Sequence, residues 1–125
     1  MSLPDKYQAI KLFWSNFQLP VYEENTVPDE AEMPYITFEF KTANIGVPLT
    51  LSAQLWYYSQ TWEEINQKTA EIAAYIGFGH KIIPIQGGYL YIAQGSPFAQ
   101  PFPEQGNDMV RRMYINISAE FFTAD

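Results

Sequence analysis

The sequence predicts one α+β domain over residues 1–125, with a mostly antiparallel sheet of about five strands and two helices packed on one face. Two long segments alternate apolar and polar residues with the two-residue period of half-buried strands. Two other segments space apolar residues as an amphipathic helix does. A chain of 125 residues is also long enough to bury roughly two-thirds of its unfolded surface in one core.

The first helix is predicted to begin at Pro4, because proline suits a first helical turn. Apolar residues then recur at helical spacing: Tyr7, Ile10, Phe13 and Phe17. Pro20 disfavours helix at the residue before it, so we expect the helix to end near Phe17.

An acidic loop is predicted from Val21 to Pro34. It holds five carboxylates: Glu23, Glu24, Asp29, Glu30 and Glu32. Strands are expected next over 34–41 and 49–59, where apolar and polar residues alternate. The acidic segment is interpreted either as a solvated loop or as a negative surface past which a polyanion slides.

The second helix is predicted from a capping box, Thr61-Trp-Glu-Glu64, in which the threonine and glutamate side chains each satisfy a backbone amide. One apolar stripe follows: Trp62, Ile65, Thr69, Ile72, Ala73 and Ile76. Glu64 and Lys68 are spaced for an i,i+4 ion pair, and Gly77 supplies the C-terminal stop.

A hairpin is predicted next, with strands over 81–85 and 89–94 joined across Gln86-Gly87-Gly88. Gln94 to Asn107 is rich in Pro, Gly and Gln, and Glu104 is its one ionisable side chain. We expect a long loop there that is mobile alone and ordered on assembly, as we do for Glu23 to Met33. A long strand with one buried face is predicted from Met109 to Phe122, because apolar and polar residues alternate from Arg112 to Phe121.

The outward positions of the two longest strands are uncharged and aromatic, a composition that interface cores favour. We expect this face to pack against another subunit, unless the chain's own loops cover Trp56 and Tyr58. Phe98 and Phe102 are expected to dock onto a neighbour. Arg111 and Arg112 either pair with acids across a subunit boundary or flank an exposed edge strand. The candidate interface residues are Gln54, Trp56, Tyr58, Phe98, Phe102, Arg111, Arg112, Tyr114 and Asn116.

Charge and composition weigh against several function classes. A net charge of −7 repels a phosphate backbone, so specific nucleic-acid binding is not expected. The absence of cysteine excludes disulfides and thiolate sites and suits a reducing cytoplasm, and a membrane segment is not expected. His80, the one histidine, is expected to help cap the preceding helix. We therefore predict no enzyme, no metal and no cofactor.

Two alternatives belong to other classes. One is a small-molecule-binding domain with Trp14, Trp56 and Tyr58 as the walls of an apolar pocket. The other is an enzyme that uses His80 with a nearby carboxylate.

Several segments together resemble small neck and tail proteins of long-tailed phages and prophages, most closely the tail terminator or tail completion type. They are the segments 34–38, 48–59, 61–65, 95–100 and 112–122. The resemblance implies an α+β subunit without catalytic residues that forms a hexameric ring in the virion. Such a ring caps the tail tube, binds the tail tube and head-completion proteins, and lets DNA pass without specific binding. A head-completion or connector protein is the alternative within this class.

Overall fold

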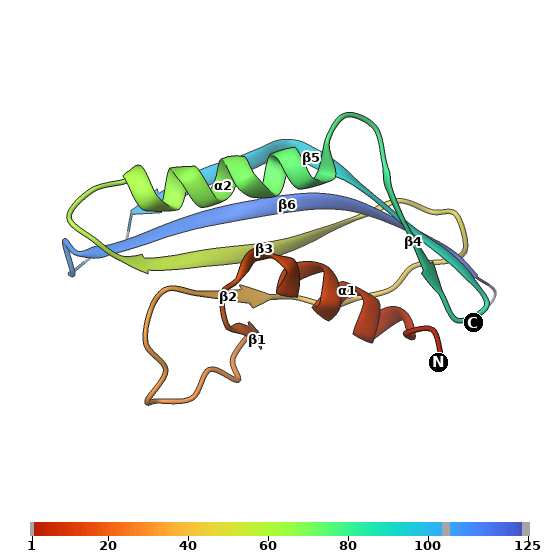
Figure 1. The fold of residues 1–125 in the computed structure, drawn as a ribbon, viewed down its shortest axis with the longest axis horizontal. Coiled ribbons are helices and arrows are strands. Elements are labelled where there is room, and N and C mark those ends of the chain that lie inside the picture. Colours follow the sequence, from red (N-terminus) through yellow and green to blue (C-terminus); the bar gives the residue numbers. More distant parts are fainter. Residues whose placement is uncertain (1, 104–105, 124–125) are drawn as a thin grey trace.

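The computed structural model describes residues 2–103 and 106–123 and contains one six-stranded sheet with two α-helices (Figure 1). The elements are α1 (Lys6–Trp14), the 3-10 helix η1 (Ser15–Phe17), β1 (Val21–Glu23), β2 (Tyr35–Phe38), β3 (Leu49–Tyr58), α2 (Glu63–Ile76), β4 (Lys81–Ile85), β5 (Gly88–Pro103) and β6 (Val110–Phe122). The sheet order is β1-β2-β3-β6-β5-β4. The α+β class is confirmed, but the sheet has six strands and is mixed, because β1 pairs in parallel with β2.

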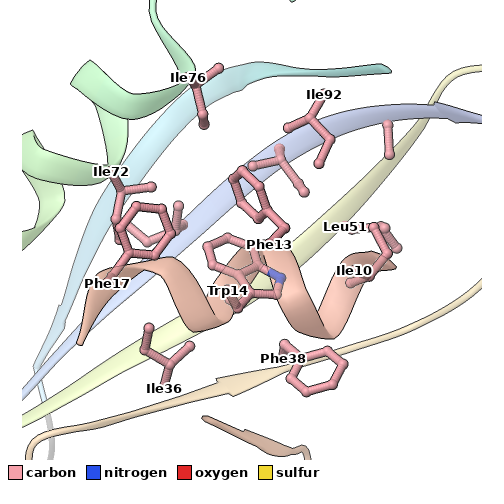
Figure 2. Close-up of a cluster of buried hydrophobic side chains, with 14 of the residues drawn as sticks. Ile10, Phe13, Trp14, Phe17, Ile36, Phe38, Leu51, Ile72, Ile76 and Ile92 are labelled. Atoms are coloured by element: carbon pink, nitrogen blue, oxygen red, sulfur yellow. The ribbon is translucent and has the colours of Figure 1, made fainter. Parts of the chain in front are cut away.

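The core lies between the helices and one face of the sheet. Register partners such as Leu51 and Ile117 are both fully buried on that face. Helix α1 contributes Phe13 and Trp14, which lie in the middle of the buried cluster in Figure 2. Because α1 contacts both β2 and β4, which lie far apart in the strand order, the sheet curls around this helix.

Helix α1 begins at Lys6 rather than at the predicted Pro4, because Asp5 is its N-cap. The Asp5 carboxylate accepts a hydrogen bond from the Gln8 amide at 2.8 Å, and the Gln8 side chain accepts one from the Asp5 amide at 3.0 Å. This is a capping box. The predicted helical end is confirmed, since η1 continues α1 to Phe17.

Helix α2 does not have the predicted capping box. Trp62 is the N-cap without a side-chain cap, and the Thr61 hydroxyl accepts from the Glu63 amide at 3.3 Å. Because the helix begins at Glu63, Glu64 is too close to the cap to reach back. Lys68 pairs with Glu71 at 2.9 Å and donates to the Phe17 carbonyl, so the predicted pairing with Glu64 is wrong. Gly77 does end the helix, with φ of +72°.

The loop predicted from Gln94 to Asn107 is wrong, because β5 continues to Pro103 and pairs with β6. The register shifts between Gln94 and Ala99, so a bulge absorbs the Gly-Ser-Pro sequence there. A Cβ on Gly95 would lie 2.7 Å from the Asn116 carbonyl oxygen, so the close approach of β5 to β6 at this position requires glycine. Glu104 lies outside the described residues.

The prolines of β5 are compatible with a strand because β4 pairs only with residues 88–92. Beyond that point β5 is an edge strand, where proline is tolerated if its missing N–H would face away from the partner. Pro101 and Pro103 lie two positions apart and so direct their missing donors to the same outer edge. The proline-rich composition of this segment therefore indicated a loop, although the segment forms an edge strand.

Strand β1 lies in the segment predicted as an acidic loop. Val21 pairs with Ile36 and Glu23 with Phe38, and the Ile36 amide donates to the Pro20 carbonyl at 2.9 Å. Three residues are too few to show a period, which is why the sequence did not indicate this strand. The rest of the segment, from Glu24 to Pro34, has no strand or helix.

Candidate functional site

The sheet face turned away from the helices, here called the outer face, carries the residues predicted to form an interface. Its positions on the two central strands are Thr50, Ser52, Gln54, Trp56 and Tyr58 of β3 and Arg112, Tyr114, Asn116, Ser118, Glu120 and Phe122 of β6. All of them lie within the described residues, and only Arg112 and Glu120 among them are charged. Both strands alternate because their other side chains fill the core.

Arg112 lies at the centre of this face, between two aromatic rings. The strand register places Trp56 on one side of it and Phe102 on the other. Its guanidinium carbon is 4.3 Å from the centre of the Trp56 ring and 4.7 Å from that of Phe102. Its Nε and Nη2 donate to the Gln54 side-chain oxygen at 3.2 and 2.6 Å. The charge is thus stabilised by ring faces and by a side-chain amide.

An aromatic row extends from Arg112 in both directions. Tyr35 lies 6.1 Å from Trp56 and 5.6 Å from Tyr22 between ring centres, while Tyr114 lies 5.3 Å from Phe102. The row therefore takes side chains from five strands. Burial, and then the neighbouring Tyr22, raise the pKa of Tyr35 above its ordinary value. The phenol accordingly stays neutral at physiological pH.

Hydrogen bonds between side chains hold the outer face in place. The Trp56 indole donates to the Thr37 hydroxyl at 3.0 Å. The Ser52 hydroxyl donates to the Asn116 side-chain oxygen at 2.7 Å, and the Asn116 amide donates to the Pro97 carbonyl at 3.0 Å. These contacts join β2, β3, β6 and the bulge of β5, so the surface is arranged before any partner arrives.

Most of the predicted interface residues are brought together here: Gln54, Trp56, Phe102, Arg112, Tyr114 and Asn116. Tyr58 lies at the end of the same face and is 59% exposed, so the chain's own loops do not cover it.

Two predicted interface residues lie elsewhere. Arg111 alternates with Arg112 and faces the helices, where it donates to the Gln60 carbonyl at 2.9 Å and lies 5.3 Å from the Trp62 ring. Phe98 is half-buried against the core. The structure thus places both against their own chain, and neither joins the outer face.

The acidic segment borders the outer face. Glu23, Glu24, Asp29, Glu30 and Glu32 are all exposed. Glu24, Asn25 and Val27 line one side of an open pocket of about 490 Å³ whose other side includes Trp56 and Arg112. The pocket has mainly polar walls, and Trp14 is fully buried in the core, so the predicted apolar pocket walled by Trp14 is wrong.

His80 is not the residue that caps the preceding helix: the Ala73 carbonyl accepts from the Gly77 backbone N–H at 2.9 Å and from the Gln94 side chain at 3.2 Å. The His80 ring instead lies 5.5 Å from the ring of Tyr91. Among residues 2–103 and 106–123, His, Asp and Glu side chains form no group of three that could hold a metal ion. The same residues contain no helix long and apolar enough to cross a membrane. Comparisons of the chain with protein-family models, curated proteins and solved structures each give no match.

Tyr22, Tyr35 and Thr37 also lie on the outer face but were not among the predicted interface residues. The alternation predicted over 34–41 does set Tyr35 and Thr37 opposite the buried Ile36 and Phe38. Tyr22 could not be found in this way, because it reaches the face only through the short parallel strand β1.

Proposed function

We propose that this protein is a non-enzymatic structural subunit that assembles with copies of itself into a ring. The ring is proposed to terminate the tail tube of a phage or prophage and to join it to the head. The main support for this proposal is the outer face, because aromatic and uncharged polar side chains from five strands lie together on it. The resemblance to tail terminator proteins supplies the biological setting.

The composition of the outer face supports subunit contact. Interface cores are depleted in charge and enriched in Tyr, Trp, Phe and Arg, since unpaired charges would have to be desolvated. Here the central charge is Arg112, and its Nε and Nη2 already donate to Gln54. Because the side chains are held by one another, a partner would immobilise few additional rotamers, which lowers the entropic cost of association.

The sheet edge supports contact through the face rather than through added strands. An exposed strand edge is a template for pairing with another chain, and proline removes the donors that pairing requires. The outer edge of β5 carries Pro101 and Pro103 at donor positions. Strand addition along this part of the β5 edge is therefore disfavoured, whereas side-chain contact through the outer face is not.

Charge supports the role of a DNA conduit. The formal charge of −7 and the five exposed acids of segment 23–32 would repel phosphate, so DNA could move past without being held. A head-completion or connector protein of the same neck region would share these properties and is the alternative assignment.

The proposal is tested by measuring mass against concentration with light scattering and sedimentation velocity. The unmodified chain should form larger species as concentration rises. The double variant Thr50→Lys/Tyr58→Lys places two charges at exposed outer-face positions and should remain monomeric. The control Asn66→Lys/Gln67→Lys adds the same charge at exposed positions of α2 and should assemble as the unmodified chain does.

A strictly monomeric unmodified chain at millimolar concentration would overturn the proposal. Equal assembly by both double variants would show that copies do not meet through the outer face.

A further inference from the structure

Phe78 lies at the tip of the connection between α2 and β4 and is fully exposed, at 107% of the reference area. The flanking Gly77 and Gly79 have φ of +72° and +83°, a backbone conformation that glycine adopts without strain. The loop therefore holds a phenyl ring away from the fold, where it contributes no burial to the stability of its own chain.

A recess that suits such a ring lies elsewhere on the molecule. Its volume is about 330 Å³, and its walls include Tyr7 and Phe40, whose ring centres are 5.4 Å apart at 83°. Thr42 and Gln86 line it as well. A cavity of roughly 150 Å³ already accepts benzene, so this recess has room for a phenyl side chain. Aromatic walls add edge-to-face contacts.

Phe78 cannot fill the recess of its own chain. Strand β4 separates the two, with Phe78 before its first residue and Gln86 just after its last. A strand from residue 81 to 85 spans roughly 13 Å at the usual rise per residue. Figure 1 shows the α2–β4 loop at one end of β4 and the β4–β5 turn at the other.

We propose that Phe78 of one copy inserts into the recess lined by Tyr7 and Phe40 of the next copy. This inference rests on the proposed self-assembly and specifies one of its contacts. A projection and a recess at different places on the same chain make a head-to-tail contact, which closes into a ring when the rotation permits. A lipid surface is the less suitable occupant for Phe78, because anionic headgroups repel a chain of charge −7.

The first test compares the association constants of two alanine variants. Phe78→Ala should weaken assembly by about ten- to a hundredfold, the equivalent of burying one large apolar side chain. Its monomer should melt at the same temperature as the unmodified chain, because the ring is exposed. The control Leu12→Ala removes an apolar side chain that is 57% exposed on α1 and should leave assembly unchanged.

The second test uses the absence of cysteine from the chain. His80→Cys places a thiol beside Phe78, and Thr42→Cys places one at the recess; both positions are exposed. A short bismaleimide should cross-link a mixture of the two variants and should leave each variant alone uncross-linked. That pattern distinguishes a head-to-tail contact from a symmetric one.

The outcomes separate this contact from the broader proposal. If the unmodified chain and Phe78→Ala assemble equally, the Phe78 contact is overturned and self-assembly stands. Cross-linking of His80→Cys with itself would also overturn it, because the contact would then be symmetric. A chain that stays monomeric at every concentration would overturn both.

Discussion

Arg112 occupies the centre of the outer face because β3 and β5 both pair with β6 at that position. The register sets Trp56 and Phe102 beside it, and Gln54, only 8% exposed, accepts from its guanidinium. A planar guanidinium can stack on rings and donate in its own plane at the same time, whereas an ammonium cannot. The residue thus organises the surface as much through packing as through charge.

We therefore predict that Arg112→Lys lowers the free energy of unfolding by about 1–2 kcal/mol, although the charge is kept. Loss of the stacked contacts and of the paired donation to Gln54 accounts for the effect. Urea unfolding measures it. Lys11→Arg, an exchange of the same kind at an exposed position of α1, should change the free energy by less than about 0.5 kcal/mol. An unchanged urea midpoint for Arg112→Lys would contradict this account.

At the scale of elements, the sequence predicts best where one face alone is buried. The alternation of β3 and β6 located both strands almost to the residue, and with them most of the outer face. The strand predicted over 89–94 is part of β5, but residues 95–103 were predicted to form a loop because their prolines and the bulge suit an edge strand and a loop equally well. Arg111 was misplaced because it was grouped with Arg112, although the two-residue period of β6 puts it on the opposite face, together with Met113.

The two helix starts give a second prediction, because only one has a capping box. Asp5→Ala should cost about 1 kcal/mol of unfolding free energy, since it removes the acceptor of the Gln8 amide. Thr61→Ala should cost clearly less, because Thr61 lies outside the N-cap position and its contact with the Glu63 amide is 3.3 Å long.

Urea unfolding of the two single variants, with Ile72→Ala as a reference, makes the comparison. Ile72 is fully buried, so its truncation should cost about 2–5 kcal/mol. If Thr61→Ala costs as much as Asp5→Ala, α2 begins at Thr61 in solution and the predicted capping box forms after all.

At the scale of the whole molecule, charge and apolar surface are distributed unevenly. The five acids of segment 23–32 are exposed on the margin formed by β1 and the following loop. Exposed apolar side chains lie at other places, among them Ile45, Phe78, Ile82 and Tyr89. The proposed head-to-tail ring requires distinct surfaces for neighbours and for solvent or a polyanion, and this uneven distribution is compatible with it.

We predict no measurable affinity of the unmodified protein for duplex DNA at physiological salt. Binding to DNA gains its free energy mainly from counterions released by Lys and Arg, with a salt slope of about one for each neutralised phosphate.

Exchanging Glu23, Glu24 and Glu30 for lysine moves the formal charge from −7 to −1, because each exchange adds two positive charges. If these residues line the channel of the ring, the assembled variant should bind DNA with a steep salt dependence. The control exchanges Glu64, Glu71 and Asp108, which are exposed at other places, and should bind far more weakly at the same total charge. Equal binding by both triple variants would mean that segment 23–32 does not face the DNA, whereas tight, salt-sensitive binding by the unmodified chain would contradict the proposed conduit itself.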